Sequence, residues 1–235
     1  MIPTGEITGT SEPNKTATRT NTPTQLQVLG KTKDGRDLKV RRIWPLPFVC
    51  FADRGFDEGV AGHISPINAP AFAIHSEIHK ARPEVNATCH IHSVAGKAFS
   101  CFGRELEMIT QDALRFYKSH GVYRDFKGVV LDQDEGQRIV AALGQGKAVI
   151  LQNHGLLMVG ESVDEATFWF ISLDKTCQTQ LLADAAAAAG YKKIVIDEQE
   201  AAYAAMRIGG PEKGWLAFQP YYAEQVAETR GEFLQ

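Results

Sequence analysis

The sequence predicts an α/β fold, and three observations support this prediction. Strand-like and helix-like patterns alternate through the middle of the 235-residue chain, which is typical of layered α/β domains. The hydrophobic content of 44% suffices for one full core, and no internal repeat divides the chain. Pattern alone leaves the order of the strands open.

One folded domain is expected to follow an N-terminal tail. The first residues are dominated by Thr, Asn, Pro, Ser and Gly, and such a segment buries too little apolar surface to offset its ordering entropy. We therefore predict a disordered tail over residues 1–30 and a single domain over residues 31–235.

The first predicted elements flank a pair of histidines. Asn68 can cap a helix that has Pro70 in its first turn and ends at Arg82-Pro83. The run from Val85 to His92 is a strand candidate. The following elements are short: a helix over 93–102 closed by Gly103, a helix over 111–117 and a strand over 128–131.

The second half alternates in the same way. A helix from Glu135 to Leu143 should stop at Gly144, and Ala148 to Leu151 reads as a buried strand. After turns at Gly155 and Gly160, the S-x-x-E sequence at 162–165 predicts a capping box that opens a helix to about residue 189. The last expected elements are an extended piece at 194–196, a helix at 198–207 and, after a break at 209–211, an aromatic-rich segment.

Composition excludes several classes of partner. The formal net charge is −3 with scattered charges, which argues against nucleic acid, and no apolar run is long enough to span a membrane. The four cysteines form no CxxC pair, so a reducing, cytoplasmic location fits best. The C-terminal aromatics predict packing onto a neighbouring subunit and hence a homo-oligomer: Trp215, Phe218, Tyr221 and Tyr222.

Three histidines form the candidate site. Side chains two residues apart on a strand share a face, so His90 and His92 should present two imidazoles side by side. His154 follows the predicted strand at 148–151, and strand ends are where α/β proteins assemble sites. Three imidazoles with an open fourth position are typical of a catalytic metal site. The spacing alone also allows an alternative without a metal, in which His90 and His92 are half-exposed strand residues and His154 is a core or turn residue.

The sequence motifs around these histidines indicate a family. The sequences NATCHIHS after ARPE, and LQNHGLL, resemble the class II aldolase/adducin family, with the nearest likeness to adducin-like proteins of fungi and bacteria. The resemblance implies a three-layer α/β/α domain with a central mixed sheet. It also implies that His90, His92 and His154 bind a divalent metal, with zinc as first choice and iron or manganese as alternatives, which acts as a Lewis acid.

The sequence departs from that family at both acid/base positions. Ala71 stands where the aldolases have a catalytic glutamate, and Gln111 stands near their proton-donating tyrosine. His75, one turn after Ala71, could serve as a fourth ligand or general base, or could simply be a packed helix residue. Gln111 can hydrogen-bond a substrate oxygen but cannot donate a proton. These changes argue against a retro-aldol reaction on a sugar phosphate.

A second departure concerns length. Ser65 runs within three residues to Asn68, whereas the family has several tens of residues there, so some strands are expected to be missing. The remaining sheet could be re-covered, by residues 43–50 for example, or the chain could be a shortened isoform or a misassembled reading frame.

Three functions remain open. The first is a metal-dependent lyase, of aldolase or decarboxylase type, that acts on a small oxo- or hydroxy-acid with help from His75 or Gln111. The second is a non-catalytic adducin-like module that binds actin or another cytoskeletal partner. The third is a non-haem iron oxygenase, because some relatives in this branch, the prenylated-benzoate synthases, are oxygenases and histidine-rich sites suit iron as well as zinc.

Overall fold

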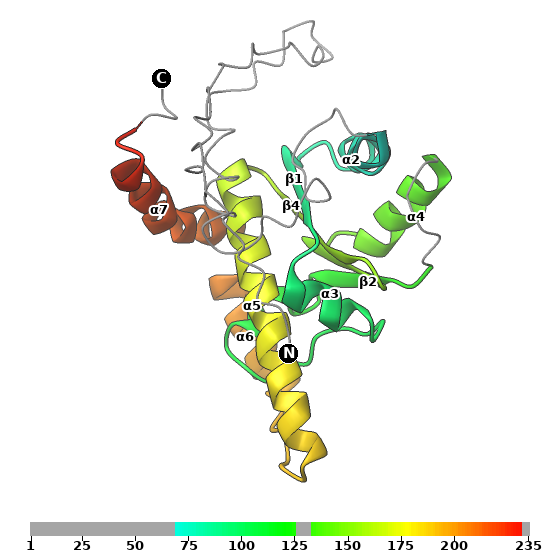
Figure 1. Cartoon of the computed structure of the whole chain (residues 1–235), viewed down its shortest axis with the longest axis vertical. Helices are drawn as coiled ribbons and strands as arrows, with labels where there is room; N and C mark the ends of the chain where they lie inside the picture. Colours follow the sequence, from blue (N-terminus) through cyan, green and yellow to red (C-terminus); the bar gives the residue numbers. More distant parts are fainter. Residues whose placement is uncertain (1–68, 126–132, 232–235) are drawn as a thin grey trace, which may run out of the picture. The chain divides into compact units, whose positions relative to one another are not determined.

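The structure is a computed structural model that describes residues 69–125 and 133–231 (Figure 1). Several predictions therefore lie outside the described residues. They are the tail over 1–30 and its boundary, the short junction after Ser65, the covering segment at 43–50 and the strand at 128–131.

Helices and strands alternate through the described residues as the sequence predicts. The helices are α2 (Ala69–Ala81), α3 (Val94–Ser100), α4 (Gln133–Leu143), α5 (Val163–Ala188), α6 (Glu198–Ile208) and α7 (Pro211–Glu228). The strands are β1 (Ala87–Ile91), β2 (His120–Tyr123), β3 (Ala148–Leu151) and β4 (Gly155–Gly160). The predicted helix at 111–117 is a single 3-10 turn, η2 (Ala113–Phe116), and no strand forms at 194–196.

The four strands form one mixed sheet in the order β1-β4-β3-β2. β4 pairs antiparallel with both β1 and β3, whereas β2 pairs parallel with β3. The predicted mixed sheet is thereby confirmed. Two of its strands were not predicted: the residues from Gly155 to Gly160 were expected to be turns, and His120 to Tyr123 had no assignment. β4 was missed because it is buried along its whole length and so lacks alternation.

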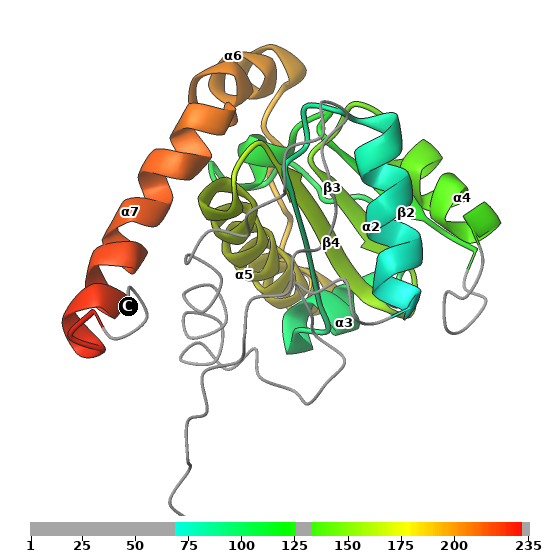
Figure 2. The same ribbon diagram turned by 90° about the horizontal axis from the view of Figure 1, so that it is seen from above.

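Helices cover both faces of this sheet, and Figure 2 shows α2 and α4 on one side and α5 on the other. Alternate β1 residues face opposite ways: Cys89 and Ile91 pack with Trp169 of α5. The second core cluster joins α2 and α4 to the other face through Ile74, Ile78, Ile139, Leu143, Val149, Leu151, Leu157 and Val159. The three-layer α/β/α arrangement is thus confirmed.

The C-terminal helix α7 packs against α5. Phe218 is fully buried in the core of its own chain, and Gly214 approaches so closely that an added Cβ would lie 2.7 Å from the Trp169 ring. The expectation that these aromatics pack onto a neighbouring subunit is therefore wrong for Phe218, because α7 folds back onto α5. Trp215 stays 47% exposed.

The start of α5 and the ends of α4 and α5 lie where the capping residues of the sequence predict. The Ser162 side chain accepts a hydrogen bond from the Glu165 backbone N–H at 3.2 Å, so α5 begins there. The Glu165 carboxylate turns back to the Glu161 N–H at 2.7 Å, one residue earlier than in a standard capping box. Gly144 and Gly190 follow α4 and α5 with positive φ angles of 53° and 100°.

Candidate metal site

Strand pairing brings the two histidine segments together. Because β1 and β4 are antiparallel, the end of β1 lies beside the start of β4, with Ile91 opposite Leu156. His92 directly follows β1, and His154 directly precedes β4. His90 lies opposite Leu157, on the sheet face that α2 and α4 cover. The site therefore forms at one end of the β1–β4 pair.

The tight connection between β3 and β4 aims His154 at this end of the sheet. The His154 N–H donates to the Leu151 carbonyl at 3.0 Å, and Asn153 adopts a left-handed conformation with φ of 56°, which asparagine tolerates better than most residues. Gly155 follows, and a Cβ there would lie 3.0 Å from the Ile91 carbonyl oxygen. The absence of a side chain at Gly155 thus allows the hairpin to approach His92.

The three imidazoles converge on one point. One ring nitrogen from each of His90, His92 and His154 lies within 4.8 Å of the others. The ring centroids are 4.6–4.9 Å apart, and the rings are nearly perpendicular, with interplanar angles of 74–78°. His90 is 3% exposed, and the other two rings are half-buried. Such a cluster has one deep ligand and two nearer the solvent.

A backbone carbonyl fixes the tautomer of His90. Its Nδ1 lies 2.9 Å from the carbonyl oxygen of Leu156, and since a carbonyl only accepts, Nδ1 carries the proton. In the neutral ring Nε2 then has the lone pair, and it points at His92 Nε2 at 3.0 Å. A metal-binding histidine is typically oriented by such a bond on its other nitrogen.

The donor set fits a divalent metal. Two nitrogens that bind zinc at about 2.0–2.1 Å in tetrahedral geometry are roughly 3.3 Å apart, close to the observed contact between His90 and His92. All three donors are imidazoles, which suit zinc and iron alike. The predicted ligands thus meet in space, and their binding of a metal stays a prediction.

A buried carboxylate anchors the segment that follows the histidines. Asp174 of α5 accepts a hydrogen bond from the Gly96 N–H at 3.0 Å and another from Ser93, which caps α3 directly after His92. Burial raises the pKa of this carboxyl above its ordinary value, although both donors oppose the shift. The sequence analysis missed Asp174. Its signal was a single acid within the apolar stretch FWFISLDKTC.

The two predicted assisting residues lie on different elements. His75 is half-buried on α2, the helix that covers the sheet face of His90, but it does not belong to the converging set among the described residues. Gln111 lines a separate hollow with residues of α5, among them Lys175 and Thr176. The roles of His75 and Gln111 stay predictions. For Ala71 only its place on α2 is described.

Comparison with known proteins identifies relatives by sequence. A family model, Class II Aldolase and Adducin N-terminal domain, matches residues 66–181. A Streptomyces niveus protein named decarboxylase NovR is 45% identical over 68% of this chain. A Streptomyces roseochromogenus subsp. oscitans protein, named 4-hydroxy-3-prenylphenylpyruvate oxygenase/4-hydroxy-3-prenylbenzoate synthase, is 45% identical over 69% of it. The chain covers only 58% and 57% of these two relatives.

Two further matches extend over most of the chain. The meiotically up-regulated gene 14 protein of Schizosaccharomyces pombe is 34% identical, covering 83% of this chain and 94% of its own. A solved structure named L-fuculose 1-phosphate aldolase from Glaciozyma antarctica has a TM-score of 0.71 and 36% identity, covering 83% and 93% of the two chains. The S. pombe alignment spans 243 positions, more than the whole 235-residue chain, so part of that relative has no counterpart here.

No helix among the described residues has the length and apolar character needed to cross a membrane.

Proposed function

We propose that this chain, which belongs to the class II aldolase and adducin family, is a divalent-metal-dependent lyase acting on a small oxo- or hydroxy-acid. The observation that carries the proposal is the convergence of three imidazoles, with the deepest one held by a backbone carbonyl. The names of relatives, a decarboxylase and an aldolase among them, support a lyase of either type.

The chain's residues would act by holding and orienting. His90, His92 and His154 supply three nitrogens and leave a coordination position for substrate oxygen. A bound divalent ion supplies Lewis-acid stabilisation of negative charge on that oxygen. Because neutral imidazoles cancel none of the ion's charge, the site favours an anionic ligand, such as the paired oxygens of an oxo- or hydroxy-acid. The buried ring of His90 cannot swing away while Leu156 holds Nδ1.

Proton transfer is assigned within the same proposal. His75 is our candidate base, since it lies on the helix that covers the His90 face and an imidazole accepts a proton near neutral pH. Gln111 lines a hollow beside α5, so its predicted hydrogen bond to a substrate oxygen has no support from the position of the three histidines, and it would move no proton. A His75→Gln variant should therefore lose turnover while keeping its metal.

A second candidate is an iron-dependent oxygenase. The observation that favours it is the relative whose name contains both an oxygenase and a synthase activity. The same three imidazoles suit ferrous iron, so the donor set agrees with both candidates. Zinc remains our first choice for the lyase.

Metal content tests the proposal. Protein purified without chelator should carry about one equivalent of divalent metal by mass spectrometry, and a His90→Ala/His92→Ala variant should carry none. His79→Gln is the matched control. His79 lies on α2 outside the cluster, and its Nδ1 contacts the Val85 carbonyl oxygen at 2.9 Å. A wild type that neither retains metal nor takes up added zinc or iron would sink both candidates. Iron with substrate-dependent oxygen uptake would favour the oxygenase over the lyase.

The predicted homo-oligomer is also kept as a proposal. Large apolar side chains remain exposed near the end of α5 and in the segment after it: Leu182 at 67%, Tyr191 at 74% and Ile194 at 84%. A contact between copies would cover them. Cytoplasmic location and a cytoskeletal partner stay predictions.

A further inference from the structure

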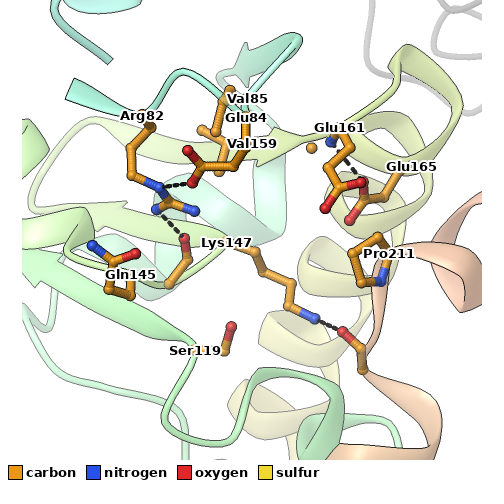
Figure 3. A pocket seen from close by; sticks show the side chains of 13 residues that line it. Arg82, Glu84, Val85, Ser119, Gln145, Lys147, Val159, Glu161, Glu165 and Pro211 are labelled. Carbon is orange, nitrogen blue, oxygen red and sulfur yellow. Dashed lines mark hydrogen bonds and ion pairs between the residues drawn. The ribbon is translucent and has the colours of Figure 1, made fainter. Parts of the chain in front are cut away.

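A second hollow lies at the end of the sheet opposite the histidines. It has a volume of about 210 Å³. Its lining comes from the residues just before β1, β2 and β3, those just after β4, and the junction between α6 and α7 (Figure 3). Five residues of β1 separate the two ends, about 16 Å at 3.3 Å per residue. The two sites therefore share strands but no residues.

The Lys147 side chain lines this hollow. Lys147 is fixed on both sides of its Cα, because its N–H donates to the Ser119 carbonyl and its carbonyl accepts from the Val159 N–H, each at 2.8 Å. Its Nζ lies 4.1 Å from the centre of the Trp169 ring and donates to the Gly209 carbonyl. Figure 3 shows the Lys147 side chain extended across the hollow, with a dashed line for its hydrogen bond to the Gly209 carbonyl. The amine thus has a defined position.

The charge of Lys147 lacks a close carboxylate. Within residues 69–125 and 133–231, no carboxylate forms an ion pair with its Nζ. Other lysines differ: Lys193 contacts Asp184 at 2.6 Å and Glu107 at 2.7 Å, and Lys80, 60% exposed, contacts Glu77 at 2.6 Å. Lys147 combines a half-buried amine with neutral hydrogen-bonding and ring partners.

Burial and two charged groups on the surrounding elements act on this amine. Burial, the largest cause, and the positive charge of Arg115 in η2 lower the pKa of Lys147 to about 8, although the Glu165 carboxylate of α5 raises it. At pH 7 an amine with that pKa is roughly a tenth deprotonated, against about 0.03% for one at 10.5. Buried lysines of this kind are those that proteins use as nucleophiles.

We propose that Lys147 is a second reactive group, which forms an imine with a small uncharged aldehyde that enters this hollow. The neutral amine attacks the carbonyl carbon, a C–N bond forms, and the carbonyl oxygen leaves as water after two proton transfers. Glu161 lines the same hollow and would exchange those protons, whereas both carboxylate oxygens of Glu165 are engaged by the Glu161 N–H and the Trp169 indole N–H. No oxidant or reductant is required.

The lining selects the class of aldehyde. Glu84, Glu161 and Glu165 contribute three carboxylates against two cationic side chains, and the cation Arg82 is bound by Glu84 and by the carbonyls of Gly144 and Gly146. Anionic carbonyl compounds are therefore disfavoured, and a volume of about 210 Å³ accommodates a small aldehyde.

Reductive trapping tests this proposal independently of any metal. Full-length protein is incubated at pH 7 with limiting glycolaldehyde and sodium cyanoborohydride, and labelling of each lysine is followed by peptide mass spectrometry. Lys147 should be labelled about tenfold faster than the exposed Lys80, since lower intrinsic nucleophilicity and restricted access offset part of the gain in deprotonated amine. A Lys147→Arg variant should lose this fast phase and keep the slow labelling elsewhere.

Two further arms make the outcome decisive. In guanidinium chloride the advantage of Lys147 should vanish, because it depends on the folded hollow. The anionic aldehyde glyoxylate should label Lys147 more slowly than glycolaldehyde does. Labelling no faster than at Lys80, or an advantage that survives unfolding, overturns the proposal, and equal labelling by glyoxylate overturns the choice of an uncharged ligand.

Discussion

The two ends of the β1–β4 pair hold functional groups in opposite ways. At the histidine end, three short side chains converge because strand pairing places the end of β1 beside the β3–β4 hairpin. At the other end, the single long side chain of Lys147 reaches from the start of β3 over Trp169 to the carbonyl of Gly209. A backbone carbonyl orients a nitrogen in both cases. Convergence of neutral donors is suited to binding a metal, whereas one isolated amine is suited to acting as a nucleophile.

The largest expected effect tests whether α5 supports the histidine end. Asp174→Ala removes the acceptor of Ser93 and Gly96, so the free energy of unfolding should fall by about 2–3 kcal/mol. Metal affinity should fall about 10–100-fold, because Ser93 follows His92 directly. Denaturant titration and competition with a chromophoric chelator measure the two quantities.

Asp174→Asn is the control for charge. Since burial raises the pKa of Asp174 in the folded state, that state binds this proton more tightly than the unfolded state, and stability falls as pH rises through the window above the ordinary value. Asn resembles the protonated acid, so it should cost less than Ala at neutral pH. If Asp174→Ala kept the metal affinity of the wild type, α5 would not support the histidine site through Asp174.

An intermediate effect is expected where the hairpin meets β1. In Gly155→Ala the new Cβ would lie 3.0 Å from the Ile91 carbonyl oxygen and 3.5 Å from His92 Cδ2, so the strands must shift. We expect a loss of about 1–2 kcal/mol and weaker zinc binding. Gly210→Ala at the other end meets nothing within 4 Å, and as a change at the N-cap of α7 it should cost about 0.5 kcal/mol. Thermal unfolding with and without zinc distinguishes the two, and equal shifts would contradict the close approach.

The smallest effect concerns pH at the lysine end. The folded-state pKa of Lys147, about 8, lies below the ordinary 10.5, so between these values the unfolded state binds more protons and stability rises with pH. The unfolding free energy of the wild type minus that of Lys147→Met should therefore rise from pH 7.5 to 9.5, by about 1 kcal/mol after screening. Denaturant titrations at both pH values measure it. A constant difference would mean that the Lys147 amine titrates normally.

Much of the secondary structure could be predicted from local patterns in the sequence. The i, i+2 spacing of His90 and His92 placed both on one side of a strand, and Ser162 marked the start of α5. Those features depend on residues close together in the chain, where propensity and capping decide. The histidine-containing words also sufficed to identify the family.

The tertiary structure decided the rest. That His154 meets His92 depends on β4, a strand whose uniform burial hid its period, and on the order β1-β4-β3-β2. The contacts of Asp174 with Gly96, 78 residues away, and of Lys147 with Gly209, 62 residues away, have no local signature. Such pairings are set by packing between elements, so their partners are fixed only when the whole sheet and its helices assemble.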